Sequence, residues 1–335
     1  MRAIQISQTG GPEVLTLRDL PTPTPGPGQA LIRIEACGIN FIDVYLREGR
    51  YPAQLPFIPG QEAAGVVVAL GPDVATVKVG DRVAWCNLPG TYAQFAVAPV
   101  TRLIAIPEGV TTRQAAAAML QGMTAHYLSH STYPIQPGDT VLIHAGAGGV
   151  GLLLIQMAKR LGARVLTTVS SEEKAALAGD AGADEAILYT REDFTAKVRE
   201  LTGGKGVAVV YDSVGKTTFD GSLSCLRPRG LLALFGGSSG AVPPFDLIQL
   251  STRGSLYITR PTLKDYTATR EDLELRAGDV LRWVADGSLK LRMEHSYPLA
   301  EAAQAHRDLE ARRTTGKVLL INDVPGDGST SLSPP

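Results

Sequence analysis

A glycine-rich segment, GAGGVG at residues 146–151, has the clearest capacity for chemistry in this sequence. It follows an apolar run at 140–144 and precedes a stretch whose apolar residues recur at helical spacing. Glycines in such a turn let the backbone approach a pyrophosphate, and the free N–H groups of a helix N-terminus bind its charge. The segment therefore predicts a dinucleotide site. Its candidate binding residues are Gly146, Gly148, Gly149 and Val150.

The type of nucleotide is indicated by the residues about 20 positions after this loop, where NAD-binding proteins place an acidic residue on the ribose 2′-hydroxyl. This sequence has Ser170 and Ser171 at the end of the next apolar run, and Lys174 one helical turn later. Hydroxyl and ammonium groups attract the additional phosphate of NADPH, so the pattern favours NADPH over NADH. An alternative stays open at this point: Ser171 could cap a helix, with Lys174 on the solvent-exposed face.

Side chains suited to binding a metal ion are sparse. His126 and His130 could share a helix face, but no glutamate follows His126 and no cysteine cluster lies near them. Cys37, Cys86 and Cys225 are far apart, which excludes a disulfide framework and a four-cysteine zinc site. We expect a metal-free protein in which hydrogen bonds activate the substrate.

The elements that must position these residues follow two different patterns. Residues 1–122 contain short apolar runs broken by proline and glycine, such as the alternating run at 30–36. They predict a compact, mostly antiparallel β-barrel or sandwich. Residues 263–322 contain helices followed by a last strand, and we expect them to fold back onto this first domain, making it discontinuous.

Between residues 123 and 262, strands alternate with helices of about 10–12 residues. Examples are the strands expected at 164–169 and 231–235 and the helix expected at 217–226. This alternation predicts βαβ crossovers and a doubly wound parallel sheet, so the fold class is α/β. The Gly-, Ser-, Thr- and Pro-rich residues 323–335 are interpreted as a disordered tail without function.

The charge and hydropathy of the 335 residues exclude several partners. Lys and Arg total 32 and Asp and Glu total 33, so no basic field exists to hold nucleic acid. No secretory signal is recognisable at the N-terminus, and the most apolar run, 141–158, contains His144, Gln156 and four glycines. We expect no membrane span and a cytoplasmic location.

Taken together, the ordered motifs resemble those of the zinc-independent medium-chain dehydrogenases/reductases, specifically the NADPH:quinone oxidoreductase (zeta-crystallin-like) family. The matching stretches are GGPEVL (10–15), GINFIDVY (38–45), GQEAAG (60–65), GDRV (80–83), HAGAGGVG (144–151), YDSVG (211–215), FGGSSG (235–240) and TRPT (259–262). The resemblance spans residues 1–322 and implies a GroES-like catalytic domain combined with a Rossmann nucleotide-binding domain.

At two positions this chain differs from the zinc-dependent medium-chain dehydrogenases. Asn40 stands where those enzymes carry a catalytic cysteine, and Gln61 stands where they carry a histidine. An amide is a much weaker zinc ligand than a thiolate or an imidazole. The resemblance therefore agrees with the expectation of a metal-free site.

The resemblance also implies roles for individual residues. Asn40, Tyr45 and Tyr51 would line the substrate cleft, where amide and phenol groups can donate hydrogen bonds to quinone oxygens. The residues implied for the cofactor are Thr124, Phe235 and Gly237 at the nicotinamide riboside and Ser170, Lys174, Tyr189 and Arg312 at the 2′-phosphate. The last position is ambiguous by one residue, because Arg313 follows directly. A homodimer is also expected, formed through the open edge of the parallel sheet near residues 231–258.

The sequence is compatible with three candidate functions. The first is metal-free, NADPH-dependent reduction of quinones in the cleft between two domains. The second is NADPH-dependent reduction of an activated C=C bond in enals, enones or enoyl thioesters, since one fold can serve both reactions. The third is a nucleotide- or RNA-binding protein without catalysis, which the net charge does not favour.

Overall fold

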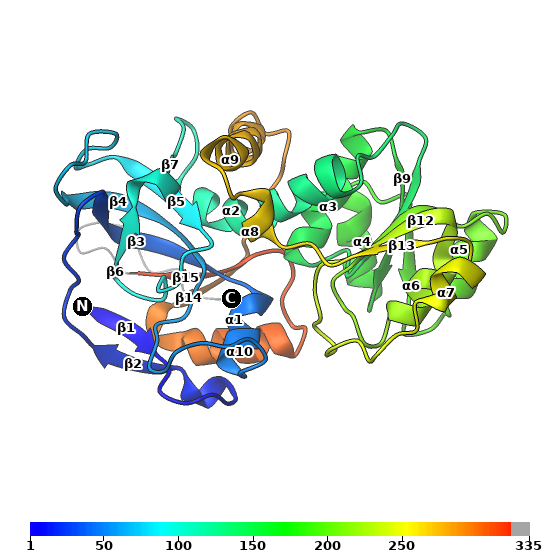
Figure 1. Cartoon of the computed structure of the whole chain (residues 1–335), viewed down its shortest axis with the longest axis horizontal. Helices are drawn as coiled ribbons and strands as arrows, with labels where there is room; N and C mark the ends of the chain where they lie inside the picture. The colour runs from blue at the N-terminus through cyan, green and yellow to red at the C-terminus, as the bar shows by residue number, and fades with distance from the viewer. Residues whose placement is uncertain (323–335) are drawn as a thin grey trace.

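The computed structural model describes residues 1–322, and the tail expected at 323–335 lies outside the described residues. Two parts lie side by side, with helix α2 (Thr112–Tyr127) between them (Figure 1). One part contains a mostly antiparallel sheet and the other a parallel sheet, as the α/β fold class predicts.

The first sheet is built from both ends of the described chain, in the order β14-β15-β3-β4-β5-β7, with β6 paired to β3. Its strands are β3 (Gln29–Ile39), β4 (Glu62–Leu70), β5 (Arg82–Cys86), β6 (Phe95–Pro99), β7 (Ile104–Ala105), β14 (His295–Pro298) and β15 (Val318–Ile321). A separate pair is formed by β1 (Arg2–Gln5) and β2 (Thr16–Asp19). Antiparallel pairing of β15 with β3 brings Val318 opposite Ile39, so the last described strand lies in the same sheet as β3.

Strand β3 shows why this part folds as it does. Ala30, Ile32, Ile34 and Ala36 alternate with less buried residues, which places one face of the strand in the core. The helices of this part are α1 (Phe41–Arg47), α8 (Leu263–Tyr266), α9 (Arg270–Ala285) and α10 (Ala302–Glu310).

The parallel sheet has the strand order β10-β9-β8-β11-β12-β13. Its strands are β8 (Thr140–His144), β9 (Arg164–Val169), β10 (Glu185–Leu188), β11 (Val207–Asp212), β12 (Leu226–Leu234) and β13 (Tyr257–Thr259). Its helices are α3 (Gly149–Arg160), α4 (Glu172–Asp180), α5 (Phe194–Leu201), α6 (Phe219–Cys225) and α7 (Ile248–Thr252). The strand order reverses between β8 and β11, and doubly wound folds bind ligands at the carboxyl ends of the strands at this point.

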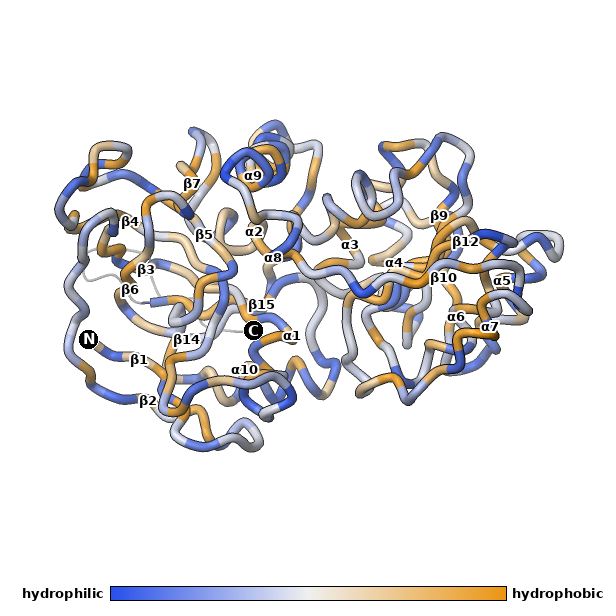
Figure 2. The backbone as a smooth tube through the Cα atoms, viewed as in Figure 1, coloured by the Kyte–Doolittle hydropathy of each residue, from blue (hydrophilic) through white to orange (hydrophobic). Residues whose placement is uncertain are grey.

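Burial explains the character of these strands. All six residues of β11 are buried, as expected for a parallel sheet with both faces covered. Figure 2 shows apolar residues gathered along the strands of this sheet. Strand β12 begins at Leu226 rather than at the expected residue 231. Leu226 already pairs with Val207 of β11, and a register shift follows this pair. Helix α6 therefore ends at Cys225.

Helix α2 connects the two parts. It packs against β3, β4 and β5 and also against α3 and α9, and its alanines join one continuous apolar core. The expected boundary at 122/123 falls inside this helix. Among residues 1–322, no helix is long and apolar enough to cross a membrane.

Candidate functional site

The glycine-rich loop lies between β8 and α3, at the reversal point of the parallel sheet. Ala145 has a φ of 56°, and Gly146 and Gly151 are packed so closely that a Cβ atom would collide with Thr167 and with the Ala145 carbonyl group. Helix α3 starts after the N-cap Gly148, which supplies no side-chain acceptor, and its first turn has no acidic residue. Backbone N–H groups at this end are thus available to an anion.

Three of the four residues expected at a 2′-phosphate meet at the end of β9. Lys174 donates from Nζ to the backbone oxygen of Arg312 at 2.8 Å, and the Arg312 guanidinium donates to the Tyr189 hydroxyl at 3.2 Å. Burial and the nearby Arg312 charge lower the pKa of Lys174. The hydrogen bonds that Lys174 and the Arg312 guanidinium donate within residues 1–322 go to a backbone carbonyl and to a phenol, both neutral, so the cluster suits an added anion.

Ser170, Ser171 and Arg313 lie near this cluster in sequence and have their own hydrogen-bond partners. Ser170 follows β9 directly, and its backbone oxygen accepts a 3.2 Å hydrogen bond from Thr190. Ser171 is the N-cap of α4 and accepts from the Lys174 backbone N–H at 3.3 Å, so the capping alternative and the Lys174–Arg312 contact occur together. Arg313 instead pairs with Asp308, through an Nε–Oδ1 distance of 2.9 Å. Of the two arginines, only Arg312 therefore forms hydrogen bonds with Lys174 and Tyr189 within residues 1–322.

The two expected substrate-site tyrosines touch the nucleotide-binding part. Tyr45 lies on α1 and is 7% exposed; its hydroxyl oxygen accepts from the Gly237 backbone N–H at 3.1 Å. Tyr51 is 38% exposed, with a ring centroid 5.5 Å from that of Tyr45, and its hydroxyl accepts from Arg260 at 3.3 Å. Burial raises the pKa of Tyr45, so its hydroxyl keeps its proton at neutral pH.

Two arginines join this contact that the sequence did not single out. Arg50 lies 5.4 Å from the Tyr45 ring centroid and donates to the Gly237 carbonyl at 3.3 Å. Arg260 also donates to the Leu234 carbonyl at 3.0 Å. Arg260 could have been found from the sequence, because it lies within the TRPT motif. Arg50 lies outside the matching motifs, so nothing in the sequence indicated its role.

Asn40 has its amide fully engaged within the protein. Its Oδ1 accepts from Lys317 Nζ at 3.0 Å and from Gln121 at 3.4 Å. Its Nδ2 donates to Glu62 Oε1 at 3.1 Å and to the Gly38 carbonyl at 3.4 Å. Its expected contact with a substrate stays a prediction.

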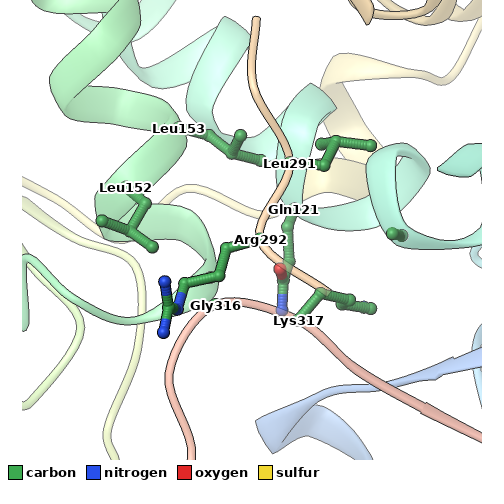
Figure 3. A pocket seen from close by; sticks show the side chains of 9 residues that line it. Gln121, Leu152, Leu153, Leu291, Arg292, Gly316 and Lys317 are labelled. Carbon is green, nitrogen blue, oxygen red and sulfur yellow. The ribbon is translucent and has the colours of Figure 1, made fainter. Parts of the chain in front are cut away.

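A small cavity lies between the two parts, beside this amide cluster. Its lining includes Gln121 of α2, Gly149 and Leu152 of α3, and Gly316 and Lys317 before β15. Figure 3 shows Gln121 extending toward the segment that carries Gly316 and Lys317. The start of α3 and the surroundings of Asn40 therefore share one cavity. Thr124, further along α2, is also buried, and Phe235 follows β12 directly.

Metal-binding side chains do not gather in this region. Within residues 1–322, no group of three or more His, Cys, Asp or Glu residues is arranged to hold a metal ion. His126 and His130 stack with ring centroids 4.4 Å apart, and His126 contacts Asp279 at 3.0 Å. Burial lowers the pKa of His126 to about 4, consistent with a neutral packing residue. Cys37 of β3 is fully buried, and burial raises the pKa of its thiol.

A Rossmann-type sheet inserted beside a GroES-like sheet, with a glycine-rich loop at their junction, defines a medium-chain dehydrogenase/reductase. The family model described as alcohol dehydrogenase GroES-like domain matches residues 26–108, and that described as zinc-binding dehydrogenase matches residues 149–274. More specifically, the chain belongs to the zinc-independent quinone oxidoreductase family of these enzymes.

The relatives that establish this cover almost the whole chain. A quinone oxidoreductase of Pseudomonas aeruginosa is 48% identical over 96% of this chain and 99% of its own. A 2-haloacrylate reductase of a Burkholderia species is 43% identical over 95% and 98%, respectively. The crystal structure of Escherichia coli quinone oxidoreductase complexed with NADPH has a TM-score of 0.94 and 42% identity, covering 96% of this chain and 100% of that one.

Proposed function

We propose that this protein catalyses the NADPH-dependent reduction of quinones where its two parts meet. The observation that carries the proposal is the end-to-end similarity to quinone oxidoreductases, at up to 48% identity. The Lys174–Arg312–Tyr189 cluster supports the choice of NADPH, because it places two cations where a carboxylate would favour NADH.

The residues present fit the cofactor. The uncapped first turn of α3, with Gly148, Gly149 and Val150, would hold the pyrophosphate, and Gly146 allows the close packing behind it. Ser170, Lys174, Tyr189 and Arg312 would hold the 2′-phosphate, and Thr124, Phe235 and Gly237 would lie along the nicotinamide. When bound, NADPH supplies the hydride.

The chain itself binds the substrate and orients it. The Tyr45 oxygen accepts from Gly237, so its own O–H remains free to donate to a substrate oxygen. Tyr51 packs edge-to-face against the Tyr45 ring, its hydroxyl accepts from Arg260, and it would cover the face of the quinone. Asn40 would border the same site. Together these groups hold the substrate, exclude water and stabilise negative charge on its oxygen.

A second candidate reaction is the reduction of an activated C=C bond. It is supported by the 2-haloacrylate reductase, whose named substrate class contains such a bond. In that reaction the Tyr45 hydroxyl would deliver the proton. The two reactions differ in whether the chain must supply a proton to carbon, because a quinone oxygen can take its proton from water.

The domain boundaries, assembly and location complete the proposal. We place the catalytic part at 1–122 and 263–322 and the nucleotide-binding part at 123–262. A homodimer would form through β13, the last strand of the parallel sheet, where Tyr257 is exposed. A cytoplasmic location is supported by three buried cysteines without disulfides.

Product analysis separates the two reactions. The purified protein is supplied with NADPH and, in separate assays, with a panel of quinones and a panel of enals and 2-haloacrylates. We expect hydroquinone products at a higher kcat/KM than any saturated aldehyde or acid. NADPH oxidation that no quinone accelerates would overturn the proposal.

A further inference from the structure

A buried ion pair lies behind the substrate site and takes no direct part in the proposed chemistry. Lys317 precedes β15 and is 3% exposed, and Glu62 begins β4 and is fully buried. The ammonium and carboxylate groups are in direct contact. Replacing such a buried pair with well-packed hydrophobic side chains of similar volume is often neutral or stabilising, so stability alone does not account for this one.

The pair reaches the substrate site through Asn40. Lys317 donates to Asn40 Oδ1 at 3.0 Å, and Glu62 accepts from Asn40 Nδ2 at 3.1 Å. The two charges therefore fix both ends of one amide. Because Asn40 is the N-cap of α1, its position sets the start of the helix that carries Tyr45.

The same segment also reaches the cofactor loop. The Gly316 backbone N–H donates to the Ala147 carbonyl at 3.1 Å, and Gly316 forms an isolated bridge with Gly148. Gly316 and Lys317 are consecutive, so one dipeptide contacts the glycine-rich loop through its backbone and Asn40 through a side chain. The other carboxylate oxygen of Glu62 accepts from the Leu120 backbone N–H of α2 at 2.5 Å.

We propose that Lys317 is a positioning residue, which together with Glu62 keeps Asn40 and helix α1 aligned with the glycine-rich loop. The inference rests on the proposed function, because alignment matters only where substrate and cofactor react. Small errors in the relative placement of reacting groups reduce turnover strongly, whereas binding of each ligand alone depends less on that placement.

The experiment compares Lys317→Met, the double variant Lys317→Met/Glu62→Gln, and Lys290→Met, an exposed lysine used as the control. Lys317→Met leaves an unpaired buried carboxylate, and we expect its Tm to fall by several degrees. In the double variant the charge is removed and the Tm returns toward that of the wild type. A purely structural role predicts that activity returns with it.

We expect the opposite for activity. In the double variant kcat stays about 10-fold or more below the wild type, while the Kd for NADPH changes by less than about 2-fold. Hydrogen–deuterium exchange rises in residues 40–47 and 145–150 and stays unchanged in α4. The control behaves as the wild type in Tm, kcat, the Kd for NADPH and hydrogen–deuterium exchange.

Two outcomes overturn the inference. One is a double variant with kcat within about 2-fold of the wild type. The other is wild-type exchange in both segments, a result that does not depend on any activity. A wild-type protein without NADPH-dependent reductase activity would instead overturn the proposed function, and exchange alone would then decide whether the pair holds Asn40 in place.

Discussion

The phenolic oxygen of Tyr45 accepts a 3.1 Å hydrogen bond from the backbone N–H of Gly237, which joins helix α1 to the loop after β12. This contact crosses between the catalytic and nucleotide-binding parts. It leaves the Tyr45 O–H group available as a donor at the position where substrate and nicotinamide are proposed to meet.

Tyr45→Phe tests this donor. We expect quinone reduction to fall only about 3- to 10-fold, the effect of losing one or two neutral hydrogen bonds. Reduction of an enal should fall much further, because the proton for the α-carbon is then missing. Parallel measurements of kcat on one quinone and one enal give the ratio. Unchanged enal reduction would remove Tyr45 as the proton donor, and Tyr51→Phe, which removes the other phenol of the proposed site, shows whether the effect is specific to Tyr45.

The choice of cofactor should depend on Arg312 and not on Arg313. Lys174→Ala and Arg312→Ala each remove a charged donor, so we expect the KM for NADPH to rise about 10- to 100-fold while that for NADH stays nearly constant. Arg313→Ala is the matched control, because its guanidinium pairs with Asp308. Steady-state kinetics with both cofactors measures the effect. An equal loss in Arg313→Ala would contradict the assignment.

His306 should make the stability depend on pH. Burial and the Arg47 charge lower the pKa of His306 to about 3, and its ring bonds Arg47 and Tyr92 at 3.1 Å each. The unfolded chain, with an ordinary pKa near 6.5, binds a proton below that pH and the folded chain does not. The free energy of unfolding therefore falls with acidification, by about 2 kcal/mol from this residue between pH 7 and pH 5.

Urea unfolding of His306→Gln at the two pH values isolates this contribution. The stability difference between wild type and variant should shrink by about 2 kcal/mol at the lower pH. His295→Gln, in β14 and outside this hydrogen-bond network, is the matched His-to-Gln control. A wild-type-to-His306→Gln difference that is constant across this range would show that His306 does not resist protonation in the folded state.

The proposed dimer should depend on the edge strand β13. Tyr257 is 61% exposed there, and a lysine at a sheet edge opposes pairing with another strand. We expect Tyr257→Lys to halve the mass measured by light scattering. Leu275→Lys, at a 56% exposed position on α9, should remain dimeric. A wild-type monomer at micromolar concentration would refute the dimer itself.

Much of the fold could be predicted because its signals are local. The apolar runs at 140–144 and 164–169 coincide with β8 and β9, and the glycine loop between β8 and α3 follows from neighbouring residues. The contact between Asn40 and Lys317 could not be predicted in this way. It depends on the pairing register of β15 with β3, which joins residues 277 positions apart.

The sequence also could not predict which of two adjacent residues makes a given contact. Arg312 and Arg313 are chemically identical, yet they have different partners, and Arg312 has a left-handed backbone with a φ of 58°. Likewise, the motif around Asn40 indicated a residue near the substrate. That its amide is engaged by Glu62, Lys317, Gln121 and Gly38 is a property of packing between distant segments.

The most direct test of the central proposal is the initial rate of cofactor oxidation with 1,4-benzoquinone, measured with NADPH and with NADH, before and after treatment with EDTA. The proposal predicts quinone-dependent oxidation with kcat/KM at least about 10-fold higher for NADPH, the effect of one charged phosphate contact, and no loss after chelation. Absence of quinone-dependent oxidation, a preference for NADH, or inactivation by EDTA would contradict it.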